Sequence, residues 1–257
     1  MKIRSLFAAA NVGFMFLLLV SGEARAAELK VLSALATRTV MADVGPMFER
    51  ATGHKLAVTF VTLGEAVKRV QGGETFDVVI MPAMPGFLKG SAAAADNVTV
   101  IARSGIGVAV RKGAARPDIS SPEALRGALL AAKSITYANP AGGGAAGIHF
   151  AKVLDRLGIA NEMKSKTVFH SRADETGILV ANGEAEIGVN QIQVLMPVAG
   201  IEIIGPLPGD LQDNIVFSAA IMTGTNNAEA SKALVAFLRT PEAAAVMKSK
   251  GMEPATP

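Results

Sequence analysis

Residues 29–35 read LKVLSAL, residues 56–60 read LAVTF and residues 76–82 read FDVVIMP. Each stretch is short and mostly apolar, which is typical of a strand that is buried on both faces of a parallel sheet. The intervening segments 37–52 and 62–71 have helical starts and apolar faces, and a glycine follows each of them. Three strands joined by two helices predict a parallel βαβαβ unit and therefore an α/β fold.

Strand and helix patterns continue to alternate along the rest of the chain. Further strands are predicted at residues 98–102, 105–110, 134–138, 167–169, 185–190, 201–204 and 215–220. Further helices are predicted at residues 121–130, 148–157, 174–182, 227–238 and 241–250. The length suits one large or two small α/β domains.

The first 26 residues have the three parts of a secretory signal peptide. Lys2 and Arg4 supply positive charge, an apolar run spans residues 6–20, and Ala24-Arg25-Ala26 is a small-x-small cleavage site. The apolar run is shorter than the about 20 residues that a membrane span needs. We expect cleavage after Ala26 and a periplasmic mature protein; the alternative is an uncleaved N-terminal anchor.

The composition excludes several function classes. Loss of the signal peptide removes Lys2, Arg4 and Arg25 against Glu23, so the formal net charge falls from +3 to about +1. That balance gives no reason to expect a nucleic-acid partner. The chain has no cysteine, and its three histidines lack the spacing of metal ligands. We therefore expect no disulfide, no metal site and no cofactor.

Five short motifs, taken in their order and spacing, resemble one protein family. They are KVLSA at 30–34, MFERATG at 47–53, GGETFDVVI at 72–80, NGEAEIG at 182–188 and FLRTPEAAA at 237–245. Together they make the chain similar to the molybdate-binding component of bacterial ABC transporters, a periplasmic solute-binding protein of type II. The resemblance spans nearly all of the mature chain.

The resemblance implies a two-lobed periplasmic-binding-protein-like fold, in which each lobe is a mostly parallel sheet flanked by helices and two hinge crossovers join the lobes. It places the first lobe at residues 27–106 and 221–257, and the second lobe at residues 107–220. It also implies a monomer that is not an enzyme. Such a protein captures a small anion by lobe closure and delivers it to an ABC permease in the inner membrane. The alternatives are an exported module that presents its ligand to a sensor or envelope partner, and a secreted enzyme.

Ligand loops in such a fold lie at the carboxyl ends of strands, where helix N-termini present free N–H groups to an anion. Two arginines on loops of opposite lobes would suit a dicarboxylate, since a guanidinium binds carboxylate oxygens in pairs. The alternatives are rim ion pairs for the arginines and simple helix capping for the threonines. The predicted ligand-binding residues are Ser33, Thr37, Arg38, Thr62, Gly144, Ala146, Arg172, Ala173 and Gln191.

The expected ligand loops depart from the family pattern. Molybdate-binding members use hydroxyl-rich loops, but residues 59–64 read TFVTLG without serine, and Gln191 stands where the family has a tyrosine. The family's serine near the first helix start is replaced by Ala36 or Thr37. Neutral donors of that kind ring a tetrahedral oxyanion. We therefore expect molybdate to bind more weakly than some other inorganic or organic anion.

Residues 142–147 read GGGAAG, which follows a predicted strand and precedes a predicted helix. The spacing G-x-G-x-x-G is also found in dinucleotide-binding turns, but the acidic residue required about 20 positions later is not clearly placed. We favour a loop in which a ligand anion approaches backbone N–H groups; a flexible turn is the alternative. A hydrolytic relay of Ser171 with His170 and Asp174 is a remote alternative, because neighbours on one loop rarely form one.

Overall fold

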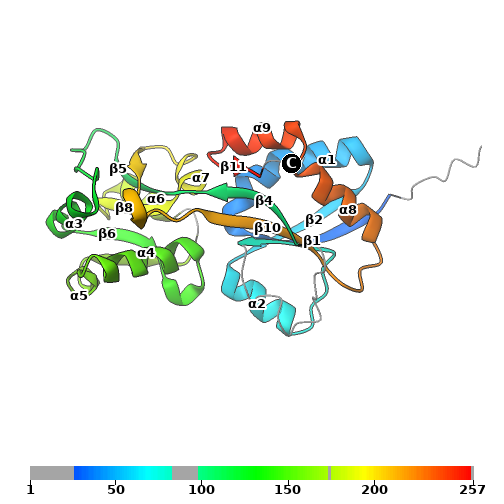
Figure 1. Ribbon diagram of the computed structural model, residues 1–257, viewed down its shortest axis with the longest axis horizontal. Coiled ribbons are helices and arrows are strands. Elements are labelled where there is room, and N and C mark those ends of the chain that lie inside the picture. Colours follow the sequence, from blue (N-terminus) through cyan, green and yellow to red (C-terminus); the bar gives the residue numbers. More distant parts are fainter. Residues whose placement is uncertain (1–25, 83–97, 173–174, 256–257) are drawn as a thin grey trace, which may run out of the picture.

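The computed structural model describes residues 26–82, 98–172 and 175–255. The predicted signal peptide, except Ala26, lies outside the described residues, and so do Ala173 and Asp174. None of the helices in the described ranges is long and apolar enough to cross a membrane. The described chain forms two sheets, each with its own helices, which lie one beside the other along the long axis of the molecule (Figure 1).

Six strands in the order β11-β4-β10-β3-β1-β2 form the first sheet. Its core is the predicted βαβαβ unit, in which β1 (Glu28–Ala34) pairs in parallel with both β2 (Lys55–Val61) and β3 (Val78–Pro82). We call this sheet and its helices the first lobe. Its other elements are α1 (Arg38–Thr52), α2 (Leu63–Gln71), β4 (Val98–Ser104), β10 (Ile215–Ile221), α8 (Ala228–Phe237), α9 (Pro241–Ser249) and β11 (Glu253–Pro254).

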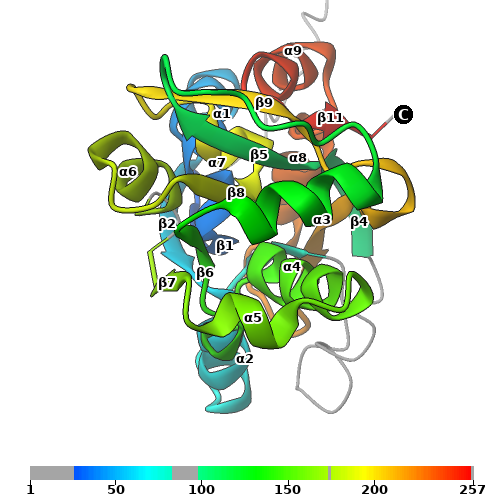
Figure 2. The same ribbon diagram turned by 90° about the vertical axis from the view of Figure 1, so that its left-hand side faces the viewer.

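Five strands in the order β7-β6-β8-β5-β9 form the second sheet. The central strand β8 (Ile187–Gln191) is parallel to β6 (Ile135–Ala138) and antiparallel to β5 (Ile106–Arg111). We call this unit the second lobe, and Figure 2 looks onto it with α3, α4 and α5 toward the viewer. Its other elements are α3 (Pro122–Ala131), α4 (Ala145–Arg156), α5 (Ala160–Lys164), β7 (Thr167–His170), α6 (Glu175–Asn182), α7 (Ile192–Leu195) and β9 (Ile201–Pro206).

Both sheets are mixed, so the prediction of mostly parallel sheets was wrong in detail. Strand β10 is antiparallel to both β3 and β4, and β5 is antiparallel to both β8 and β9. The physical reason lies in the chain path. These strands carry the chain from one sheet to the other and back, so they oppose the direction of their neighbours. The mixed α/β class with two sheets is confirmed.

Each lobe has a hydrophobic core of its own. Leu32 and Phe48 are fully buried in the first, and Ile106 and Phe150 are fully buried in the second. Ile215 at the start of β10 packs against both cores. Because each core is complete within one lobe, the lobes can shift as rigid units about the segments that join them.

The chain crosses between the sheets twice. It leaves the first sheet at Gly105, between β4 and β5, and returns between β9 and β10, so that two long strands connect the halves in Figure 1. Residues 215–220 were expected in the second lobe, but β10 belongs to the first sheet, because it pairs with β3 and β4. The exact lobe boundaries remain a prediction, and we propose the second crossing at residues 212–214.

Candidate functional site

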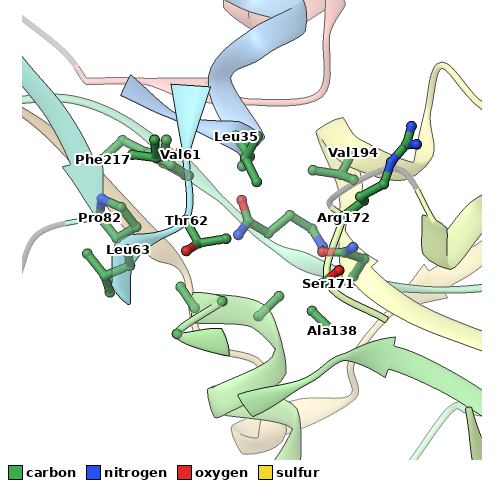
Figure 3. Close-up of a pocket in the computed structure, with 18 residues that line it drawn as sticks. Leu35, Val61, Thr62, Leu63, Pro82, Ala138, Ser171, Arg172, Val194 and Phe217 are labelled. Atoms are coloured by element: carbon green, nitrogen blue, oxygen red, sulfur yellow. The ribbon is translucent and has the colours of Figure 1, made fainter. Parts of the chain in front are cut away.

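A small cavity lies between the two lobes and is drawn in Figure 3. Its volume is about 70 Å³, well below the about 300–1,000 Å³ of pockets for drug-sized ligands. It lies where β1, β2 and β3 of the first lobe end and where α4 of the second lobe begins. We call it the inner chamber. Its place at the carboxyl ends of parallel strands is where ligands bind in open α/β sheets.

The wall from the first lobe is almost entirely apolar. Figure 3 shows Leu35, Val61 and Phe217 on this side of the chamber, with Pro82 and Leu63 near them. The single polar residue of the wall is Thr62. Its hydroxyl oxygen caps α2 by accepting a hydrogen bond from the Glu65 N–H at 3.3 Å. The predicted capping role of Thr62 is therefore confirmed, while a ligand contact remains a prediction.

The wall from the second lobe carries the polar groups. Gly144, Ala146, Ser171, Asn190 and Gln191 line it, together with small apolar side chains and Arg172. Two of these, Asn190 and Gln191, are 4% and 5% exposed and sit at the end of the central strand β8. The predicted residues Gly144, Ala146 and Gln191 thus meet at one wall. Their contact with a ligand remains a prediction.

Helix α4 points its N-terminus at the chamber and begins at Ala145, three residues before the predicted start. Its N-cap is Gly144, which has no side chain, and no side chain caps the first turn. The N–H groups of Ala145, Ala146 and Gly147 have no carbonyl within the helix to bind. They form a cluster of donors at the positive end of the helix dipole, which favours an anion.

Two glycines of residues 142–147 have a packing or backbone reason. Gly143 has a φ of 75°, in the left-handed region that side chains rarely adopt. Gly147 lies so close to the backbone of Ala138 in β6 that an added Cβ would collide with the Ala138 carbonyl oxygen. This contact seats α4 tightly on the sheet, while the anion-binding and flexible-turn interpretations of the loop both stay predictions.

A chain of amides positions Gln191. Ser104 at the end of β4 donates to Oε1 of Gln193, and Nε2 of Gln193 donates to Oε1 of Gln191 at 2.6 Å. The Gln191 carbonyl oxygen is thereby occupied, and its Nε2 group has no hydrogen-bond partner among the described residues. Its Nε2 group is therefore a free donor on a side chain that is mostly buried, and a ligand could accept its hydrogen bond.

A polar cluster lies behind the second wall. The Nε2 atom of His170 is 2.6 Å from the Thr176 hydroxyl, which also accepts a hydrogen bond from Asn190 at 2.9 Å. His170 is therefore turned into the lobe and away from the exposed Ser171. This arrangement opposes the relay of Ser171 with His170. Among the described residues no group of three histidine or acidic side chains could hold a metal ion.

Ser33 and Thr37 are buried and do not line the chamber. The Thr37 hydroxyl donates to the Ala34 carbonyl at 2.7 Å, so the 2.7 Å contact between the two hydroxyls has Ser33 as its donor. Both protons are used within the loop. Thr37 makes no capping bond to α1 either, so its predicted capping role was wrong. These two hydroxyls stabilise the turn that follows β1.

The two predicted arginines meet at a second, outer cavity of about 420 Å³. It shares Thr62, Ser171 and Arg172 with the inner chamber and adds Arg38, with Glu65 also on its wall. Arg38 lies over the ring of Phe60 at 5.3 Å and does not line the inner chamber. In Figure 3 the guanidinium of Arg172 points away from the other labelled side chains. A clamp of both arginines would therefore act in the outer cavity.

In the loop after β7, backbone N–H groups bind the side-chain carboxylate of Glu175. Oε2 of Glu175 accepts hydrogen bonds from the N–H groups of Ser171 and Arg172, at 3.2 and 2.9 Å. These two N–H groups are therefore satisfied within the loop. Sequence reasoning missed Ser171 and Asn190 as lining residues, although Asn190 ends a predicted strand and Ser171 directly follows the observed strand β7.

Two lobes around a small chamber with helix N-termini define a solute-binding protein of type II. The chain belongs to the bacterial extracellular solute-binding protein family, whose profile matches residues 29–253. It is 31% identical over 234 residues to a protein of Pseudomonas sp named aconitate isomerase, covering 88% of this chain and 87% of that one. It is also 31% identical over 253 residues to the molybdate-binding protein ModA of Azotobacter vinelandii, covering 91% and 92%.

Solved structures share the fold. The periplasmic molybdate-binding protein of Azotobacter vinelandii superposes with a TM-score of 0.72 at 20% identity, covering 89% of this chain and 99% of that one. The sulfate-binding protein SubI of Mycobacterium tuberculosis superposes with a TM-score of 0.75 at 14% identity, covering 90% and 88%. The predicted family and fold are therefore confirmed.

Proposed function

We propose that this protein is an extracytoplasmic binding protein that captures a small anion in the inner chamber and delivers it to an ABC permease of the inner membrane. The observation that carries the proposal is the chamber itself. Its second wall combines the uncapped N-terminus of α4 with the unpartnered amide nitrogen of Gln191. Both groups offer hydrogen bonds to negative charge inside an enclosed space.

Lobe closure is supported by a contact between two glycines. An added Cβ at Gly143 of the second lobe would lie 2.6 Å from the backbone nitrogen of Gly64, at the start of α2 in the first lobe. An added Cβ at Gly64 would lie 3.3 Å from the carbonyl oxygen of Gly142. Only glycine lets the two backbones approach this closely. We interpret this arrangement as the closed state that encloses a ligand.

A thermal-shift screen of the mature protein, residues 27–257, tests the proposal. The panel contains sulfate, phosphate, molybdate, acetate, propionate, butyrate and trans-aconitate, each as its sodium salt with sodium chloride as the control. A ligand that binds only the folded state raises its stability by about 2.7 kcal/mol at 100 times its Kd. We expect at least one anion to raise the melting temperature, and a flat response to the whole panel would contradict anion capture.

A second candidate function comes from the outer cavity and from the relative named aconitate isomerase. Arg38 and Arg172 would hold two carboxylates there, and the Glu65 carboxylate lines the same cavity. Isomerising an unsaturated polycarboxylate requires only that a proton leave one carbon and return to another, so no oxidant is needed. Glu65 is exposed, forms a 3.8 Å ion pair with Arg69 and is the acidic residue on the wall of this cavity, so it is the group we assign to the proton transfer.

Proton nuclear magnetic resonance of trans-aconitate with the purified protein separates the two candidates. An isomerase produces the cis isomer catalytically, and Glu65→Gln abolishes this conversion while binding remains. A binding protein leaves the substrate unchanged after many molar equivalents. Absence of conversion by the unaltered protein removes the second candidate.

A further inference from the structure

The inner chamber has one wall that gathers hydrogen-bond donors and one wall that is mostly hydrocarbon. On the second lobe, the first turn of α4, the Gln191 amide and the Ser171 hydroxyl gather at one side. On the first lobe, Leu35, Val61 and Phe217 present hydrocarbon. The ligand that fits must therefore be polar on one side and apolar on the other.

A tetrahedral oxyanion does not have that form. Its oxygens point in four directions and share the charge, so the oxygens facing the first wall would lose their water and find few donors there. Among the described residues, Thr62 is the one hydroxyl on this wall; its oxygen accepts the Glu65 N–H as a helix cap, so its single proton is the one side-chain donor that this wall offers. Of the buried hydroxyls nearby in sequence, Ser33 donates to Thr37 and Thr37 donates to the Ala34 carbonyl. An unpaired oxygen in such a place is destabilising.

The geometry points to a short organic monocarboxylate as the ligand, with its carboxylate on the second lobe and its hydrocarbon on the first. This inference rests on the proposed capture function and names the ligand class for the same chamber. The α4 N-terminus and the Gln191 amide nitrogen bind the carboxylate oxygens. The about 70 Å³ of the chamber limits the hydrocarbon part to a few carbons.

The donor side does not rest on the helix end alone. Gln191 is 95% removed from solvent, since its exposure is 5%. Its carbonyl oxygen is held by Gln193, which is itself 1% exposed and held by Ser104. The remaining Nε2 group lies on a residue that lines the chamber and has no acceptor in the described chain. A carboxylate oxygen supplies the acceptor that the amide lacks.

The test is calorimetry of the mature protein with acetate, propionate, butyrate, sulfate and molybdate as sodium salts. Burying one methylene is worth about 0.8 kcal/mol, which corresponds to an affinity gain of about fourfold per added carbon. We expect affinity to rise from acetate to propionate to butyrate by this factor. We expect sulfate and molybdate to bind at least tenfold more weakly than butyrate.

A pair of matched variants tests whether the hydrocarbon part of the ligand contacts the first wall. Val61→Thr keeps the shape of a side chain on the first wall and replaces a methyl group by a hydroxyl. It should lower butyrate affinity about fivefold and leave acetate unchanged. Val98→Thr makes the same change at a side chain that is 51% exposed and away from the chamber, and it should change neither affinity. Melting temperatures of the unliganded variants show whether both fold.

The outcomes distinguish failure of the carboxylate inference from failure of the proposed capture function. Tighter binding of sulfate or molybdate, or equal affinity for the three carboxylates, overturns the carboxylate inference while the capture function stands. An equal loss of acetate and butyrate affinity in Val61→Thr also overturns it. Absence of heat and of thermal shift with all five anions overturns both the inference and the proposed function.

Discussion

The two walls of the inner chamber are built from the same kind of element and differ in chemistry. In both lobes a strand ends, a short loop turns, and a helix begins at the cavity. In the first lobe the helix cap Thr62 accepts one N–H of its own helix and the neighbouring side chains are apolar. In the second lobe the cap is Gly144, which has no side chain and leaves the first turn uncapped. A side-chain cap thus removes one donor at the first helix start, whereas all the first-turn donors remain at the second.

The largest expected effect concerns the contact that brings the walls together. Gly143→Ala places a Cβ 2.6 Å from the Gly64 nitrogen at a φ of 75°, so the closed state becomes strained. We expect anion affinity to fall by about 1–3 kcal/mol, from overpacking of the contact in the closed state. The strain of an alanine at positive φ, about 1–2 kcal/mol, lowers the stability of the open and closed states alike. Calorimetry with the tightest anion of the panel measures it.

Gly142→Ala is the matched control for that variant. Its added Cβ meets nothing within 4 Å, and we expect its affinity to stay within about 0.5 kcal/mol of the unaltered protein, as for a surface substitution. Equal losses in the two variants would mean that the loop, and not the contact between lobes, matters. Full affinity in Gly143→Ala would break the proposed closure.

The next largest effect is expected from Gln191, which lies on the second-lobe wall of the inner chamber. Gln191→Met keeps an unbranched side chain of similar length and removes the amide donor. We expect a loss of about 2 kcal/mol in anion affinity, as for a hydrogen bond to a charged group. The unliganded protein should also lose about 1–3 kcal/mol of unfolding free energy, because Nε2 of Gln193 loses its acceptor.

The comparison variant for this wall is Gln193→Met. It breaks the chain of amides one step earlier and leaves the amide nitrogen of Gln191 in place. We expect a similar loss of stability with a smaller loss of affinity. If Gln193→Met weakens anion binding more than Gln191→Met does, then Gln191 is a structural residue and not a ligand donor.

The sequence predicted the fold well where local signals were strong. The sequences of β1, β2 and β3 are mostly apolar, and glycines follow the helices α1 and α2. The one-turn helices α5 and α7 were missed, because they are too short to show a helical period. The start of α4 was placed three residues late, since Ala145-Ala146-Gly147 has no N-cap side chain to announce a helix.

The sequence indicated which residues lie near the chamber, but it did not indicate which way their side chains point. Gly144, Ala146 and Gln191 line the chamber, as expected of residues that follow strands and gather at one edge of a sheet, while their contact with a ligand stays a prediction. Ser33 and Thr37 occupy similar positions, but their hydroxyls bind each other and Ala34. Which partners these hydroxyls bind depends on tertiary packing, and the sequence pattern does not show it. The same holds for Arg38, whose guanidinium lies over Phe60.

A smaller effect is expected from the two arginines. Arg38 and Arg172 are exposed and border the outer cavity. For an anion in the inner chamber, Arg38→Ala and Arg172→Ala should each cost less than about 1 kcal/mol of affinity, and the effect should disappear at high salt. Losses of about 2–5 kcal/mol in both variants would instead indicate a buried clamp and a ligand in the outer cavity.

The smallest effect on affinity is expected from the hydroxyls behind the first wall. Thr37→Val removes the acceptor of Ser33 and the donor to Ala34. We expect about 1–2 kcal/mol less unfolding free energy and unchanged anion affinity, because neither hydroxyl reaches the chamber. Urea unfolding and calorimetry on the same preparation check both expectations. An affinity loss without a stability loss would return Thr37 to the ligand site.

The most direct test of the central claim is a titration of the nitrogen-15-labelled mature protein with propionate, followed by amide nuclear magnetic resonance. If the anion binds at the open end of α4, the backbone N–H signals of Ala145, Ala146 and Gly147 and the side-chain amide of Gln191 will shift most and saturate together. Signals of Arg38 and Glu65 at the outer cavity will shift less. Largest shifts at Arg38 and Glu65, or saturating shifts that leave α4 unchanged, would contradict the account.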